Sequence, residues 1–206
     1  MAKTSTRIAA IGCRSHSGWA ALVTMAGPCE SPEVIDRRRI QTCDPAIRGS
    51  KQPFHTAEPL EFRDAAALLQ RCSASTARLS EQALRETMEA VRGAGYLVEY
   101  CAVTLGSGRA LPELRAVLAS HALIHTAEGE FYRDALAEAG RQCGLKICGV
   151  KEKELYERGA AHFRVTPQQL EQRVTALGKP LGSPWSQDQK YAALVAWLAL
   201  ANFPRE

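Results

Sequence analysis

The chain has 206 residues, of which 46% are hydrophobic, and its formal net charge is +4 at pH 7. This composition supports a large apolar core and excludes an intrinsically disordered protein, while the mild positive charge permits an acidic partner such as nucleic acid without requiring one. The chain shows neither a signal peptide nor an apolar run of about 18 residues. We therefore expect a cytoplasmic protein that does not interact with a membrane. The odd cysteine count and the absence of CxxC pairs predict reduced thiols.

Short apolar runs predict three strands at the start of the chain, at residues 7–12, 19–25 and 33–41. The polar stretch 14–18 predicts a hairpin loop of more than two residues between the first two strands. The three consecutive arginines at 37–39 interrupt the third apolar pattern. Such a charge run is typical of an edge strand protected against aggregation. As a phosphate contact it would instead confer affinity without sequence preference.

The middle of the chain alternates between irregular, helical and extended patterns. Proline and glycine punctuate residues 43–59, which we expect to be the least structured part. Apolar residues at three- and four-residue spacing predict helix over 60–94, with a break at 72–76. Residues 96–108 then read as a buried strand that ends in a glycine-rich loop.

The second half of the chain is mostly helical. We predict helix over 111–143, a fifth strand at 145–150 and an amphipathic helix over 151–163. Two capping boxes, which begin at Thr166 and Ser186, start the last two helices. The final helix is rich in alanine and faces the core.

This order of elements predicts an α/β fold, a mixed five-stranded sheet with helices on both faces, in one domain over residues 1–206. Residues 151–183 would form a helical insertion before the last helix. The order resembles the ribonuclease H-like fold, whose sheet runs 3-2-1-4-5. The opening IAAIGCRSHSGWAALV and the ending PWSQDQKYAALVAWLA are similar to the corresponding parts of RuvC-type resolvases.

The resemblance implies a nuclease centre with two divalent ions, Mg²⁺ or Mn²⁺, held by carboxylates from the first strand, the fourth strand and the last helix. The sequence departs from that pattern. Gly12 and its neighbours stand where an aspartate is expected, Glu99 on the fourth strand has an uncertain register, and Tyr191 replaces a second acid beside Asp188. We therefore expect a degenerate centre in which Asp188 and Glu128 retain one divalent metal at most.

The predicted sheet order also places two polar loops side by side. The first and fourth strands become neighbours, so residues 13–18 and 106–109 meet at the carboxyl edge, where open α/β sheets bind ligands. Hydroxyls, backbone N–H groups and arginines there favour a phosphate group. The alternative is that the glycines make turns and the arginines are solvated. The candidate ligand-binding residues are Arg14, Ser15, His16, Ser107 and Arg109.

A further polar group interrupts an apolar stripe in the helical region 111–143. His121, His125 and Glu128 follow one another at i, i+4 and i+7, on the face that we expect to be buried against the sheet. They could act in general acid–base catalysis, bind a metal, or satisfy one another as core residues. Asp188 is a fourth catalytic candidate, although a carboxylate in the first turn of a helix is also favoured by the helix dipole alone.

Three hypotheses about function follow. The first is a ribonuclease H-like protein with a degenerate metal site that binds a phosphate-bearing ligand, most simply nucleic acid. The second is a small hydrolase or transferase that uses the pocket of His121, His125 and Glu128. The third is a non-catalytic interaction module. Residues 118–139 also resemble bacterial proteins, but that resemblance implies no activity, and the pattern predicts no oligomeric state.

Overall fold

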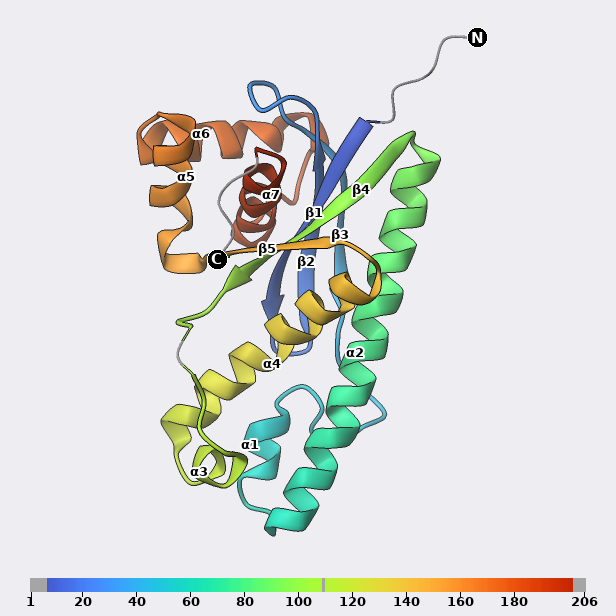
Figure 1. Ribbon diagram of the computed structural model, residues 1–206, viewed down its shortest axis with the longest axis vertical. Coiled ribbons are helices and arrows are strands. Elements are labelled where there is room, and N and C mark those ends of the chain that lie inside the picture. The colour runs from blue at the N-terminus through green and yellow to red at the C-terminus, as the bar shows by residue number, and fades with distance from the viewer. Residues whose placement is uncertain (1–6, 109, 202–206) are drawn as a thin grey trace.

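The protein is built on a five-stranded mixed sheet, seen in a computed structural model that describes residues 7–108 and 110–201 (Figure 1). The strand order is β3-β2-β1-β4-β5, so the predicted order and the α/β class are confirmed. The first three strands are antiparallel, and β4 and β5 run parallel to β1. The strands are β1 (Arg7–His16), β2 (Trp19–Ala26), β3 (Glu33–Gln41), β4 (Tyr96–Leu105) and β5 (Lys146–Lys151).

Helices cover both faces of the sheet: α7 packs on one face, and α2 and α4 pack on the other (Figure 1). None of the described helices is long and apolar enough to cross a membrane. Short 3-10 turns, η1 (Glu152–Glu154) and η2 (Lys179–Leu181), flank α5 and α6. The helices are α1 (Pro53–Ala57), α2 (Phe62–Gly93), α3 (Leu114–Leu118), α4 (His121–Gln142), α5 (Leu155–Phe163), α6 (Pro167–Leu177) and α7 (Gln187–Leu200).

Helix α7 lies unusually close to the central strand. Its residues 192–199 are all buried, and most of them are alanine or another small or medium apolar residue. A Cβ at Gly12 of β1 would overlap the carbonyl oxygen of Ala192, so only glycine permits this approach. The capping box at Ser186 is confirmed and fixes where α7 begins, and the one at Thr166 is confirmed for α6.

Two predictions about local structure are wrong. The β1–β2 loop has only two residues, because β1 continues to His16, which pairs with Trp19, and Gly18 adopts the left-handed φ of 82° that a tight turn needs. Helix α2 runs unbroken through residues 72–76, because Cys72 and Thr76 lie on its buried face and their side chains are compatible with a helix.

The helical region 111–143 is two helices rather than one. Residue Ser120 is extended, with φ −136° and ψ 109°, so α3 and α4 do not share a helical phase. Figure 1 shows α1, α3 and the first part of α4 at the end of the molecule beyond the carboxyl edge of the sheet, while the rest of α4 runs back to the sheet. His121 and His125 lie in the first two turns of α4, beside His55 of α1, and are exposed, contrary to prediction. Of the three polar residues only Glu128 is buried.

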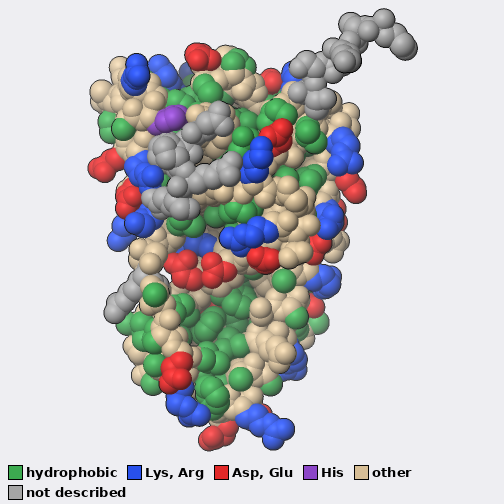
Figure 2. All heavy atoms as spheres, in the orientation of Figure 1, with side chains coloured by type: hydrophobic (Ala, Val, Ile, Leu, Met, Phe, Trp, Pro, Cys, Tyr) green, Lys and Arg blue, Asp and Glu red, His purple; other side chains and the backbone are tan. Residues whose placement is uncertain are grey.

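The surface in the same view changes character along the long axis (Figure 2). Acidic and basic side chains alternate across the middle of this face, and hydrophobic side chains gather below them, over α3 and the first half of α4. The polar band coincides with the level at which β4 and β5 end in Figure 1. Charged side chains on this face are therefore concentrated near the carboxyl ends of β4 and β5.

Candidate functional site

A row of cationic side chains crosses the end of the sheet beyond α7. Arg14 of β1 pairs in register with Ala21 of β2, and Ala21 pairs with Arg39 of β3. Directly paired residues project from the same face of a sheet, so the two arginines flank one small alanine. The face is the one that α7 covers, because Gly12, two residues before Arg14, contacts that helix. Ala21 itself is buried between them.

Arg14 is held between two carboxylates from distant parts of the chain. Its Nη2 donates to Oε1 of Glu152 at 2.8 Å and its Nε donates to Oε2 at 3.2 Å. It also forms an ion pair with Asp188 at the start of α7. The guanidinium lies 4.9 Å from the ring centroid of Tyr191, in a cation–π contact. We call Arg14, His16, Glu152 and Asp188 the arginine cluster.

His16 completes the arginine cluster. Its Nε2 lies 2.8 Å from Oδ1 of Asp188 and 3.1 Å from Nη1 of Arg14. Burial lowers the pKa of His16, and the adjacent charge of Arg14 lowers it further. Burial works to raise the pKa of Glu152, but the hydrogen bonds and charge of Arg14 outweigh that effect and lower it. The cluster therefore favours ionised Glu152 and neutral His16.

These donors do not fit a two-metal nuclease centre. The carboxylates of Asp188 and Glu152 already face one guanidinium, so a cationic side chain lies where a metal ion would have to bind. Gly12 has no room for an aspartate. Glu99 forms an ion pair at 2.9 Å with Lys146, the first residue of β5, and so lies at the end of the sheet opposite to the arginine cluster. We derive no metal-dependent step at this position.

A hollow without carboxylates adjoins the arginine cluster. It has a volume of about 380 Å³. Arg39 lies over the Trp19 ring, 3.9 Å from its centroid, and the His16 ring stacks on Trp19 at 4.3 Å. Neither Arg39 nor Lys51 forms an ion pair with any residue that the structure describes. The described lining is Ser17, Gly18, Trp19, Arg39, Ile40, Gln41, Cys43 and Lys51.

The remaining predicted ligand-binding residues lie in two other cavities. Ser15 lines one of about 230 Å³, and Ser107 lines one of about 610 Å³ that also contains Glu152. His125 and Arg133 line both cavities, which therefore lie between the arginine cluster and the first half of α4. Arg109, the fifth predicted ligand-binding residue, lies outside the residues that the structure describes.

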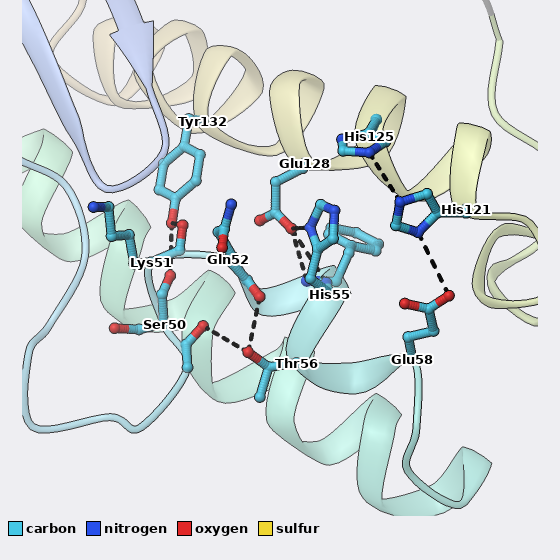
Figure 3. Close-up of polar contacts among 12 residues, drawn as sticks. Ser50, Lys51, Gln52, His55, Thr56, Glu58, His121, His125, Glu128 and Tyr132 are labelled. Carbon is cyan, nitrogen blue, oxygen red and sulfur yellow. Dashed lines mark hydrogen bonds and ion pairs between the residues drawn. The ribbon is translucent and has the colours of Figure 1, made fainter.

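The predicted residues of α4 form a second group with a partner that the sequence did not reveal. His55 of α1 approaches both His121 and His125, with ring centroids 5.6 and 4.7 Å away (Figure 3). One ligand atom from each of the three imidazoles lies within 4.8 Å of the others. We call these three residues the histidine cluster. Asp188 and Glu128, predicted to share a metal, lie in different groups, since Glu128 bonds to His55 and Asp188 to His16.

Glu128, a buried residue of α4, holds His55 of the histidine cluster in place. Its Oε2 accepts from Nδ1 of His55 at 2.8 Å and from the backbone N–H groups of Phe54 and His55. Its Oε1 is buried with no hydrogen-bond partner among the described residues. Burial raises the pKa of Glu128 despite the hydrogen bonds from His55 and Phe54, which lower it. The carboxyl group thus anchors α1 on α4 and is not free to act alone.

Three important residues escaped the sequence analysis for different reasons. Glu152 lies where we predicted an amphipathic helix, with no sign that it would reach Arg14, 138 residues earlier. His55 lies in the stretch predicted to be least structured, and the signal that could have found it is Pro53 at the first position of α1. Arg39 was interpreted chiefly as an edge charge, with phosphate contact by the arginine run as the alternative.

Comparison with known proteins gives a fold and no closer relationship. No family model matches the chain, and no curated protein matches it. The solved structure of Thermus thermophilus RuvC matches with a TM-score of 0.54 and 10% identity, over 94% of this chain and 93% of that one. T. thermophilus RuvC in complex with a Holliday junction substrate matches with a TM-score of 0.51 and 10% identity, over 96% and 98%.

A weaker match, with a TM-score of 0.36 and 14% identity, is the Aquifex aeolicus member of the Ppx/GppA protein family, over 77% of this chain and 40% of that one. The RuvC matches span nearly the whole of both chains, and the strand order agrees with the expectation from sequence. The protein therefore has the ribonuclease H-like fold in the outline of RuvC, with an arginine-centred cluster at the carboxyl edge of its sheet.

Proposed function

We propose that this protein binds nucleic acid through the cationic end of the sheet, by contacts to the phosphate backbone and without metal-dependent cleavage. The observation that carries the proposal is the pair of Arg39 and Lys51, which face a hollow of about 380 Å³ whose described lining holds no carboxylate. Two cations that form no ion pair with a described residue, beside the hydroxyl-bearing Ser17, suit a phosphate group.

The arginine cluster supports this surface without offering Arg14 as a first contact. Arg14 is occupied by Asp188 and Glu152, and its side chain is only 16% exposed. It holds the end of β1 against α7 and the residues that follow β5. His16, stacked on Trp19 and half-exposed, and Arg39 on the other side of Trp19 would then meet the ligand. Of the predicted contacts, this favours His16 over Arg14.

The fold gives independent support. A RuvC structure with the same outline has been solved in complex with a Holliday junction substrate. Phosphate contacts supply affinity that does not depend on sequence, and branched DNA presents phosphates from several strands to one surface. A protein with this fold and a cationic edge could retain binding after losing the carboxylates that cleavage needs.

The test is fluorescence anisotropy with labelled single-stranded DNA, duplex DNA, a four-way junction and RNA, across a salt series, with parallel incubation in Mg²⁺ or Mn²⁺. We expect an affinity that falls steeply as the salt concentration rises. We also expect the labelled nucleic acid to remain uncut in every incubation with metal. Failure to bind any of the four at low salt would refute nucleic-acid binding. Metal-dependent cleavage that persists in a second preparation, and disappears in an Asp188→Asn variant, would refute the claim that the centre is degenerate.

A further inference from the structure

Three histidine side chains from two helices converge at one place on the surface. His121 and His125 are one turn apart on α4, so their side chains lie on the same side of that helix. His55 of α1 faces them and contacts both rings (Figure 3). The Nε2 atoms of His121 and His125 are 3.2 Å apart. Four nitrogen atoms that surround a zinc ion as a tetrahedron, each at the usual Zn–N distance of about 2.0–2.1 Å, lie about 3.3 Å from one another. This pair therefore already has the spacing of two zinc ligands.

A carboxylate lies at the far nitrogen of two of the three imidazoles, as a hydrogen bond at His55 and as a longer contact at His121. Oε2 of Glu128 binds Nδ1 of His55 at 2.8 Å, which leaves Nε2 of His55 free to face the other two rings. Glu58 lies 3.7 Å from Nδ1 of His121, whose Nε2 faces His125. A carboxylate on the far nitrogen is the usual partner of a metal-bound histidine, because it fixes the tautomer and makes the ligand more basic.

The third ligand is held in place by bonds that do not involve the other two. The backbone N–H groups of Phe54 and His55 donate to Glu128, and the hydroxyl of Tyr132 donates to the carbonyl of Ser50 at 2.6 Å. The Phe54 ring packs edge-on against Phe131 of α4 at 5.9 Å. These contacts hold α1 against α4. Binding of a metal ion would therefore cost little further conformational entropy.

We propose that His55, His121 and His125 bind one divalent transition-metal ion, zinc being the natural occupant, with Glu128 and Glu58 orienting the ligands. Imidazole suits zinc and its neighbours in the first transition series. A bound cation would replace the hydrogen bond between His121 and His125 and join His55 to the pair. Three protein ligands leave a fourth position open to water or a small anion. His125 also lines the cavities of about 610 and 230 Å³, which give a ligand access to that position.

This centre shares no residue with the arginine cluster and does not depend on the proposed function. Besides the predicted pair of Asp188 and Glu128, the sequence left open a metal site of His121, His125 and Glu128. The structure replaces Glu128 by His55 as the third donor and moves Glu128 behind it. A metal here would tie α1 to α4 and place a Lewis acid beside the connecting cavities.

The test uses the whole chain after bound metal has been removed. Calorimetry measures the binding of Zn²⁺, and visible spectroscopy measures the binding of Co²⁺. We expect one equivalent of metal, a tetrahedral Co²⁺ spectrum without a thiolate charge-transfer band, and a change in that spectrum when azide is added. His55→Ala, His121→Ala and His125→Ala should each lower affinity at least about 100-fold, and Glu128→Gln about 10–100-fold. His162→Ala, a histidine on α5 outside the histidine cluster, is the matched control and should bind normally.

Circular dichroism in EDTA checks that each variant is folded before its affinity is compared. If the wild-type protein binds no stoichiometric metal, the proposal is wrong. It is equally wrong if the three alanine variants bind as tightly as His162→Ala, since the metal ligands would then lie outside the histidine cluster. A Co²⁺ spectrum that azide leaves unchanged would overturn the open fourth position. Loss of DNA binding has no bearing on any of these readouts.

Discussion

Gly12 of β1 lies so close to Ala192 of α7 that a Cβ at residue 12 would overlap the backbone carbonyl oxygen of Ala192. The neighbouring atom is backbone, so it cannot move aside as a flexible side chain could. This contact explains why the position cannot carry the aspartate that the RuvC resemblance implies. Close packing of α7 and a carboxylate at residue 12 exclude each other.

Substitution at this contact should be costly. Gly12→Ala should lower the free energy of unfolding by at least about 2 kcal/mol through overpacking. Gly12→Asp should be worse, because it also buries a charge. Urea denaturation measures both. Gly93→Ala, where a Cβ meets nothing within 4 Å, is the control and should be neutral or slightly stabilising. An unchanged midpoint for Gly12→Ala would mean that α7 can shift away from β1.

Arg14→Ala should destabilise the protein in a pH-dependent way. It leaves Glu152 and Asp188 without their shared partner, at a cost of roughly 1–3 kcal/mol at neutral pH. The pKa of Glu152 in the folded state lies below its usual value of 4.5, so the stabilisation is complete above pH 4.5 and is lost as the pH falls through the folded pKa. The gap between wild type and variant should therefore narrow in acid.

A double-mutant cycle isolates the Arg14–Glu152 interaction. Glu152→Gln keeps the size of the side chain and removes its charge, and the cycle subtracts the effects that each substitution has elsewhere. We expect a positive coupling free energy at pH 7 that shrinks toward pH 4. Additive effects at pH 7 would show that the ion pair contributes nothing to stability.

His16 should make stability fall as the pH drops below about 6.5. Burial and the charge of Arg14 lower its pKa in the folded state, so the unfolded chain takes up a proton first. The free energy of unfolding then decreases from pH 6.5 until the pH passes the folded pKa, where the loss levels off. His16→Gln should remove this component. Thermal unfolding of both proteins between pH 5 and 8 gives the difference, and parallel curves would contradict the prediction.

Arg39→Ala and Lys51→Ala should each weaken nucleic-acid binding and reduce the steepness of its salt dependence. Each removes one phosphate contact, so the slope of log K against log salt should change by about 0.9 for duplex DNA. Arg39→Lys keeps the charge and should retain most of the salt slope. Arg78→Ala, an exposed arginine on α2, is the control. Equal slopes for wild type and the Arg39 and Lys51 variants would place the binding surface elsewhere.

The sheet was accessible to prediction because its strands are marked by local pattern. Apolar runs, glycines and capping boxes lie within a few residues of the boundaries they set, and the order of elements restricts the topology to few alternatives. The main errors concern phase and continuity. His121 and His125 were predicted to face the sheet, but they lie in the first two turns of α4, before the part of the helix where Leu136 and Ala139 pack on the sheet. The signal for that helix start is Ser120, a favoured N-cap residue.

The candidate sites were accessible only in part. Arg14, His16 and Asp188 were each singled out from the sequence, and the tertiary structure brings them together. Their fourth partner, Glu152, was not, because a hydrogen bond across 138 residues leaves no trace in local spacing. His55 was missed for the same reason, since 73 residues separate it from Glu128.

The sequence by itself determined the class of fold, the order of the strands and the loss of the first-strand carboxylate, because those follow from residue types and their periodicity. Only the tertiary structure decided what replaces that carboxylate. Ion pairs and metal sites depend on distances between side chains from separate elements, and these distances are fixed by how α7, α4 and α1 pack on one another and on the sheet. That packing places Arg14 between two carboxylates and gathers three histidines at the base of α4.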